Sequence, residues 1–177
     1  ASFNFEKDKI NISLDKSQQK MGWLQKVEYQ EELSGQIGMS PQASAKLLEV
    51  LSPSFSATSK GVFPSISKEI TLLEEGSDGT FPYFQPWDVE GDKTRKTCLI
   101  DKGNFLSYLY DTYYATKENR LSTGNYFRFP FQSRPSIQPS KLYLVPKPGV
   151  SVLGLLKNGF WIDALFHAKL AGSSVQI

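Results

Sequence analysis

Hydrophobic and polar positions follow a helical period in one stretch of the chain that has clear start and stop signals. Between Ser40 and Pro53, leucine and valine positions recur on one face of a helix, with two alanines among them. Ser40 is the expected N-cap, and Pro41 suits the first helical position, where no N–H is needed. The pattern predicts a helix that begins at Pro41 and ends before Pro53.

A period of two predicts strands in the middle of the chain. Thr94–Ile100 is rich in β-forming residues, and Asp101–Gly103 is typical of a tight hairpin turn in which glycine supplies a positive φ. Asn104–Tyr110 is the expected return strand. Asp111 is the expected N-cap of a short helix that extends through Lys117.

Weaker patterns predict the remaining elements. Ser52–Ser67, rich in serine and proline, indicates a loop, and Ser151–Leu156 indicates a short helix. The segments for which strands are predicted are Ser2–Leu14 (two short strands), Trp23–Leu33, Ile66–Leu73, Leu142–Val145 and Phe160–Phe166. From the residues alone, the chain is a mixed domain of helices and strands.

Length and composition exclude several classes of protein. The 177 residues suffice for one domain with a core, so we expect a single domain over residues 1–177. A net charge of +2 gives no general attraction to nucleic acid or acidic membranes. No apolar run approaches the ~20 residues that span a bilayer, and Ala1–Asp15 lacks the apolar centre of a signal peptide. One cysteine excludes an internal disulfide.

Two ordered motifs carry a family resemblance. The first joins an acidic turn at Asp88–Asp92, the run Y-L-Y-D-T-Y-Y-A at Tyr108–Ala115 and the run S-T-G-N at Ser122–Asn125. The second is the run P-S-K-L-Y-L at Pro139–Leu144, followed by Gly159–Ile162. In order and spacing these motifs resemble the C-terminal half of the TldD/PmbA proteins, also called modulators of DNA gyrase.

The resemblance, strongest over residues 37–162, implies a fold and a set of partners. The implied fold is α+β, mostly antiparallel β-sheet with a few short helices. The family is related to metallopeptidases that act on unfolded peptides, and its subunits pair around a chamber. We therefore expect a cytoplasmic protein that forms a homo- or hetero-oligomer with a TldD/PmbA-type subunit, takes unfolded peptide and does not enter a membrane.

The resemblance also sets the expected metal chemistry. Active family members hold zinc with a His-Glu-x-x-x-His helix and a cysteine near the C-terminus, whereas this chain has one histidine, His167. Cys98 falls in a predicted strand and is expected to be a buried small hydrophobe. We expect no catalytic residue, metal or cofactor in this chain. That leaves enzymatic activity undecided and favours a non-catalytic structural or partner part.

The acidic turn is a second candidate for a cation site. Asp88, Glu90 and Asp92 lie close together in the sequence, but no glutamate closes the loop with the spacing of an EF-hand. A solvated turn is the favoured interpretation.

A peptide-binding site is expected in the loop made by Ser122, Thr123, Gly124 and Asn125, together with Arg128. N–H groups and hydroxyls in such a loop suit the backbone of an extended peptide. A purely structural turn stays open as the alternative interpretation.

Segment 117–147 interleaves basic and aromatic residues, which raises a different function. A peptide- or nucleic-acid-binding module that uses this segment is the alternative, because arginine and exposed aromatic rings bind single strands. Nucleic acid is disfavoured, since Phe127, Phe129 and Phe131 alternate as the core-facing side of a strand does.

Overall fold

The computed structural model divides the chain into two units, Ala1–Gly35 and Gln36–Ile177, and the description concerns the second. The described residues are Gln18, 36–61, 63, 66–80, 84–128, 134–149, 159–166, 168–171 and 174–176. The predicted elements at Ser2–Leu14, Trp23–Leu33 and Ser151–Leu156 lie outside these residues, as does His167. A single domain over all residues stays a prediction.

The helix predicted after Ser40 is confirmed. Helix α2 spans Pro41–Leu51, and the Ser40 side chain accepts a hydrogen bond from the Ala43 N–H at 3.0 Å. A 3₁₀ turn, η1, follows at Ser52–Phe55. The signals that set this helix are local, so the sequence places both of its ends.

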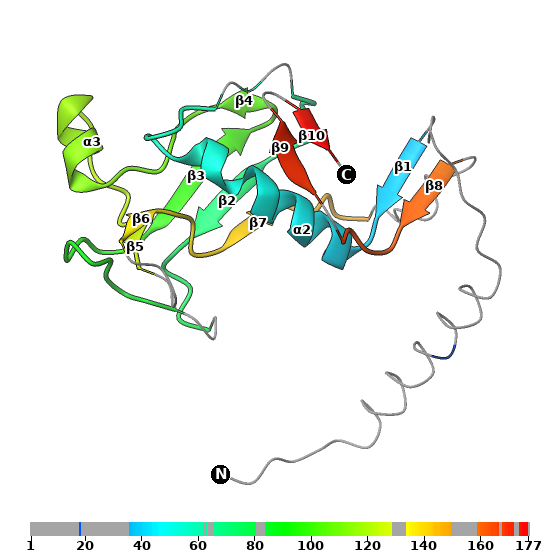
Figure 1. Ribbon diagram of the computed structural model, residues 1–177, viewed down its shortest axis with the longest axis horizontal. Helices are drawn as coiled ribbons and strands as arrows, with labels where there is room; N and C mark the ends of the chain where they lie inside the picture. The colour runs from blue at the N-terminus through cyan, green and yellow to red at the C-terminus, as the bar shows by residue number, and fades with distance from the viewer. Residues whose placement is uncertain are drawn as a thin grey trace, which may run out of the picture. The chain divides into compact units, whose positions relative to one another are not determined.

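A four-stranded antiparallel sheet in the order β4-β3-β2-β7 forms the centre of the unit (Figure 1). Its strands are β2 at Leu72–Glu75, β3 at Lys96–Asp101, β4 at Asn104–Phe105 and β7 at Leu142–Leu144.

The strand predicted at Ile66–Leu73 is wrong over most of its length. The observed strand β2 contains a glutamate that is fully buried, Glu74, and a hydrophobic pattern cannot foresee such a residue.

The hairpin between β3 and β4 forms as predicted, but its second strand is shorter than expected. Lys102 and Gly103 make the turn with positive φ angles of 46° and 78°. After Phe105 the chain leaves the sheet, and the buried Leu109 donates its N–H to the Phe55 carbonyl at 2.7 Å. Packing against Phe55 therefore ends the strand that the period-two pattern extends to Tyr110.

The short helix after Asp111 is confirmed as α3, Thr112–Lys117. The Asp111 carboxylate accepts the Tyr114 N–H at 2.7 Å and caps the helix. The core lies between these elements and consists of Phe55, Ala57, Leu72, Leu99, Ile100, Leu109, Tyr110, Ala115 and Ile137.

Three two-stranded sheets complete the described unit. Strand β1, Gln36–Met39, pairs in parallel with β8, Gly159–Ile162. The two antiparallel pairs are β5, Tyr126–Phe127, with β6, Ser136–Ile137, and β9, Lys169–Ala171, with β10, Ser174–Gln176. The expected α+β fold with mostly antiparallel strands is thereby confirmed. Within the described part of the chain, no helix has the length and apolarity needed to cross a bilayer.

Candidate functional site

The predicted site loop faces inward at three of its four residues. Thr123, Gly124 and Asn125 are buried, Ser122 is half-buried, and the nearby Arg128 is exposed. The hydroxyl and the backbone N–H of Thr123 both form hydrogen bonds with the backbone of Tyr110. The Tyr110 N–H donates to Thr123 Oγ1 at 2.8 Å, and the Thr123 N–H donates to the Tyr110 carbonyl at 3.1 Å.

Gly124 is required by a close approach of two backbone segments. Its φ is +69°, and a Cβ built there would lie 2.5 Å from the Lys93 carbonyl oxygen. Any other residue would meet both a left-handed conformation and a backbone clash. The loop is therefore fixed against Lys93 and Thr94.

Asn125 joins this loop to the second sequence motif. Its side chain is fully buried, and its Nδ2 donates to the Gln138 carbonyl at 3.4 Å. In return, the Gln138 N–H donates to the Asn125 carbonyl at 2.9 Å. The S-T-G-N and P-S-K-L-Y-L motifs thus meet side by side.

Both motifs contact one buried carboxyl group, that of Glu74. Its Oε1 accepts the Ser140 N–H at 3.0 Å and also the Ser140 hydroxyl. Asn125 and the Lys141 N–H contact the same carboxyl group. Burial raises the pKa of Glu74, and the hydrogen bonds from these neighbours oppose that rise.

Sequence reasoning missed Glu74 although one signal was present. Glu74 is two residues from Leu72, so in a strand both side chains lie on the same, core-facing side. A charged residue at a core position is typical of a functional or organising group, because burial of an unpaired charge is costly. The strand predicted there ended at Leu73 and excluded it.

The carboxylates of the acidic turn accept hydrogen bonds from backbone N–H groups. Asp88 accepts the N–H groups of Glu90, Asp92 and Tyr126 at 2.9–3.1 Å. Glu90 accepts the Thr112 N–H at 2.8 Å, and Asp92 accepts the Thr112 hydroxyl at 3.1 Å. The prediction of a solvated turn is wrong for Asp88, which is buried because its carboxylate replaces water for three N–H groups.

The acidic turn and Cys98 do not fit the kind of zinc site that the family resemblance implies. Zinc prefers nitrogen and sulfur ligands, whereas the three acids of the turn offer only oxygen, and these atoms already accept hydrogen bonds. Cys98 is half-buried in β3, and burial raises the pKa of its thiol, which disfavours the thiolate that a metal needs.

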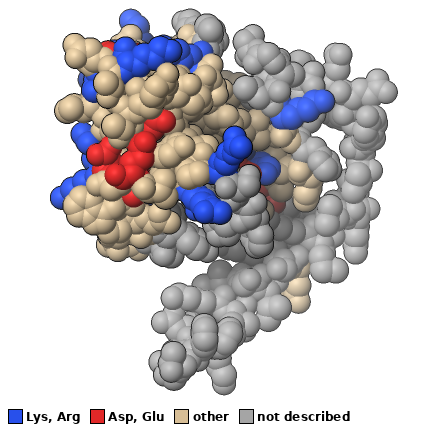
Figure 2. Space-filling view, turned by 60° about the vertical axis from the view of Figure 1, so that its left-hand side comes forward, with Lys and Arg blue, Asp and Glu red and all other residues tan. Residues whose placement is uncertain are grey.

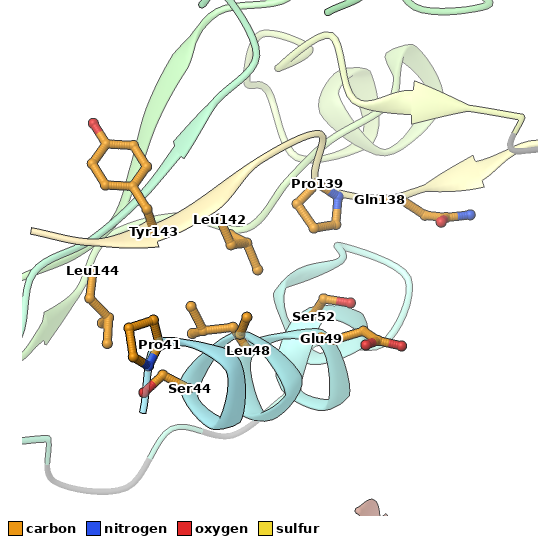
Figure 3. A pocket seen from close by; sticks show the side chains of 11 residues that line it. Pro41, Ser44, Leu48, Glu49, Ser52, Gln138, Pro139, Leu142, Tyr143 and Leu144 are labelled. Atoms are coloured by element: carbon orange, nitrogen blue, oxygen red, sulfur yellow. The ribbon is translucent and has the colours of Figure 1, made fainter. Parts of the chain in front are cut away.

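A groove of about 580 Å³ lies between α2 and β7. In Figure 3, Leu142 and Leu144 point from β7 toward α2, Leu48 points back from α2, and the Tyr143 ring points away. The residues that line the groove are Pro41, Ser44, Ala45, Leu48, Glu49, Ser52, Gln138, Pro139, Leu142, Tyr143 and Leu144. The groove is therefore mainly apolar, with polar groups at its rim.

Strand β7 is the last strand of the sheet on the side of this groove. It pairs with β2 through Glu75 N–H to Lys141 carbonyl and Val145 N–H to Thr71 carbonyl, both 2.9 Å. Because antiparallel residues alternate, Leu142 and Leu144 direct their backbone groups to the opposite edge. Across residues 36–177 as far as they are described, no strand pairs with that edge. Apart from the alternation in Leu142-Tyr143-Leu144, no sequence signal indicates this edge.

The opposite face of the sheet is polar. Lys96 and Lys141 lie 5.9 and 5.8 Å from the centre of the Tyr143 ring. Lys96 pairs with Glu75 at 3.3 Å and Lys141 with Asp78 at 2.6 Å. The hydrogen bond from Lys141, helped by Thr80, lowers the pKa of Asp78 to about 2.

In the basic-aromatic segment 117–147, Arg120, Arg128 and Arg134 are exposed. Phe127 is buried, as the packing interpretation expects, whereas Phe129 and Phe131 lie outside the described residues. The Arg120 guanidinium lies 5.8 Å from the centre of the Tyr110 ring. Figure 2 shows Lys and Arg side chains in several separate groups on one face, with acidic side chains gathered in a patch.

Comparisons with known proteins agree with the fold and the motifs. Residues 34–174 match the family described as the PmbA/TldA metallopeptidase C-terminal domain. The uncharacterized protein MJ0231 of Methanocaldococcus jannaschii is 33% identical over 121 residues, which cover 62% of this chain and 29% of that protein. Crystal structures of TldE from Thermococcus kodakarensis and of a candidate modulator of a DNA gyrase from Thermotoga maritima are also similar.

The two structures differ little in their likeness to this chain. TldE is 25% identical with a TM-score of 0.62, over 75% of this chain and 33% of TldE. The Thermotoga maritima protein is 22% identical with a TM-score of 0.63, over 77% of this chain and 34% of its own. The chain thus spans about a third of the length of these relatives.

Proposed function

This chain belongs to the PmbA/TldD family, and from that premise we propose that it is a non-catalytic structural part which contacts extended peptide in the α2–β7 groove. In this role it forms part of a wall around peptide, and a subunit or segment elsewhere carries any catalysis. Association with a TldD/PmbA-type subunit in the cytoplasm belongs to the same proposal.

The observation that carries the proposal is the edge of β7, which no strand of the described residues pairs with, beside an apolar groove. An extended peptide adds to such an edge through main-chain hydrogen bonds, here to the backbone groups of Leu142 and Leu144. Alternate peptide side chains then enter the groove against Leu48. Main-chain recognition tolerates many sequences, which suits unfolded peptides as a class.

A peptide of alternating apolar and polar residues tests edge pairing directly. Its binding is measured by fluorescence anisotropy for three forms: unmodified, N-methylated at the apolar residues, and N-methylated at the polar residues. In a strand these two sets of amides face opposite edges. We expect one methylated form to lose about tenfold or more in affinity and the other to keep it. Equal affinity of all three forms would contradict pairing with β7.

A pair of variants locates the peptide. Ala45 is exposed and lines the groove, so Ala45→Trp fills it, whereas Gln42→Trp adds the same side chain elsewhere on α2. We expect Ala45→Trp to weaken binding and Gln42→Trp to leave it unchanged. Loss of binding in both variants would indicate a general effect on α2.

Direct contact of peptide with Ser122, Thr123, Gly124, Asn125 and Arg128 stays a prediction. Its test is Arg128→Ala, because Arg128 is the exposed member of this set. Weaker peptide binding by Arg128→Ala, with unchanged stability, would extend the binding surface from the groove to this loop.

The alternative, a nucleic-acid-binding module, rests on Arg120, Arg128 and Arg134, which are all exposed. It predicts that the logarithm of the affinity for a single-stranded oligonucleotide falls steeply with the logarithm of salt concentration. Arg134→Ala should then reduce the slope. Absent or salt-insensitive binding eliminates this alternative.

A further inference from the structure

A second pocket, of about 340 Å³, adjoins the α2–β7 groove. The two share three lining residues, Ser52, Gln138 and Pro139. In Figure 3, Ser52 and Pro139 lie at the end of the groove opposite Pro41 and Leu144. The second pocket therefore extends the groove past the residues that precede β7.

The lining of this second pocket is rich in hydroxyl groups, and we call it the hydroxyl pocket. The described residues that line it include no charged side chain. Lys60, which follows the lining in the sequence, is paired with Glu118 at 2.6 Å. The five hydroxyl residues of the lining are Ser52, Ser56, Thr58, Ser59 and Ser136.

Three of these hydroxyls form hydrogen bonds with neighbours and still have hydrogens to donate. Ser56 Oγ and Thr58 Oγ1 lie 2.7 Å apart and share one hydrogen, so the pair has a second hydrogen available. Ser136 Oγ accepts a hydrogen bond from Gln138 Nε2, which does not use the hydrogen of the serine hydroxyl. Each of these groups can therefore donate to a ligand in the pocket.

Ser52 and Ser59 have the largest capacity for a ligand. Among the described residues, neither hydroxyl takes part in a hydrogen bond, so each can both donate and accept. A carboxamide also donates and accepts, and so it matches this lining. A carboxylate would enter without a counter-charge, and an alkyl group would leave the hydroxyls unpaired, and both cost binding free energy.

Main-chain pairing along the edge of β7 stops before the hydroxyl pocket. Pro139 has no N–H, and the Ser140 N–H already donates to Glu74 Oε1 at 3.0 Å. Four residues separate Leu142 from Gln138, so an extended peptide reaches the pocket about four residues beyond the one beside Leu142. Side chains four residues apart in a strand face the same side, so both would point toward the continuous lining.

We propose that the hydroxyl pocket binds an uncharged, hydrogen-bonding side chain of the peptide, with the carboxamide of glutamine or asparagine as the preferred group. An apolar side chain of the same peptide occupies the groove against Leu48 and Leu142. The inference rests on the proposed function and narrows its substrate class, since it joins an apolar and a neutral polar residue about four positions apart.

Peptides that differ at one position test this preference. The host is the alternating peptide described above, with the end residue of its apolar set changed to glutamine, glutamate or leucine. Two series, one for each end, are needed because an added strand can run in either direction. We expect the glutamine peptide of one series to bind the wild-type chain about fivefold more tightly than its glutamate and leucine counterparts. Equal affinities within both series would overturn the proposal.

A double variant assigns the preference to the hydroxyl pocket. Ser52→Ala combined with Ser59→Ala removes the two hydroxyls that make no hydrogen bond among the described residues, and we expect the preference for glutamine to disappear. Ser107→Ala is the control, because Ser107 lines neither the groove nor the hydroxyl pocket, and it should keep the preference. Full preference in the double variant would overturn the proposal.

A small amide tests the hydroxyl pocket without the groove. N-acetylglutamine amide, added to the whole chain, should shift the backbone NMR signals of Ser59 and Ser136, and the glutamate analogue should shift them much less. No shift, or equal shifts from both compounds, would overturn the proposal and mean that the pocket holds water only. Shifts without binding of any peptide would instead overturn the groove as a peptide site and leave the hydroxyl pocket in place.

Discussion

Two consecutive glutamates of β2 experience opposite environments. Glu74 is fully buried among Ser140, Asn125 and Thr97, and burial raises its pKa. Glu75 faces the polar side of the sheet, where hydrogen bonds from Ser77 and Lys96 lower its pKa. One peptide bond separates the two residues, so the difference comes entirely from the faces of the sheet.

The comparison teaches that the same carboxyl group accepts buried hydrogen bonds on one face of the sheet and forms an ion pair with the exposed Lys96 on the other. Removing a buried acceptor costs about 1–3 kcal/mol of folding free energy for each donor that is left without a partner. An exposed ion pair contributes about 0.2–1 kcal/mol. Mutations at and around the two residues test whether this ranking holds.

The largest expected effect is that of Glu74→Ala. It leaves the N–H and hydroxyl of Ser140 without an acceptor and opens a cavity in the core, which together cost about 3 kcal/mol. Urea unfolding measures the change in the free energy of unfolding. Glu75→Ala is the control and should cost less than about 1 kcal/mol. Equal losses in the two variants would break the comparison.

Gly124→Ala tests the loop that carries Asn125 to Glu74. The new Cβ meets the Lys93 carbonyl in a left-handed conformation, and we expect a loss of about 2–3 kcal/mol. Gly91→Ala is a matched control, because Gly91 has a φ of +84° and nothing within 4 Å of an added Cβ. Gly91→Ala should cost only about 1 kcal/mol of folding free energy. Similar losses in the two variants would show that the loop moves and relieves the contact between residue 124 and Lys93.

Thr123→Val removes a hydroxyl and keeps the shape of the side chain. The buried Tyr110 N–H then lacks its 2.8 Å partner, which should cost about 1–2 kcal/mol in thermal or urea unfolding. Thr123→Ser retains the oxygen and should recover most of the loss. A stable Thr123→Val variant would mean that the Tyr110 N–H finds another acceptor.

The smallest expected effect is a pair of opposite pH dependences. The raised pKa of Glu74 means that the native state keeps a proton that the unfolded state releases above about pH 4.3. Its stabilisation is therefore lost as pH rises through the native pKa. The lowered pKa of Glu75 has the reverse effect, so its stabilisation is lost as pH falls through the native pKa.

Urea midpoints between pH 3 and pH 8 measure both effects. Glu74→Gln should flatten the decline at the alkaline end, and Glu75→Gln should flatten the decline at the acid end. The change for Glu75 should stay within about 1 kcal/mol. Identical pH profiles of the two variants would show that the two faces do not differ in their electrostatics.

The sequence predicts well those elements whose stabilising contacts join residues close together in the chain. Ser40 and Asp111 cap their helices through bonds to residues three positions ahead, and the turn at Lys102 and Gly103 is complete within the hairpin. The loop at Ser122–Asn125 was also identified. Its inward-facing side chains were not, because their partners, Tyr110 and Gln138, lie more than ten residues away.

By itself, the sequence determined the family, the α+β class, the two helices and the hairpin, since motif order and capping residues act over short distances. The tertiary structure alone decided which face of β2 is buried, and therefore that burial raises the pKa of Glu74. It also decided that the S-T-G-N and P-S-K-L-Y-L motifs meet at this carboxyl group, and that β7 offers an edge beside a groove. The physical reason is that burial and pairing register arise from contacts between segments distant in sequence, which no local pattern encodes.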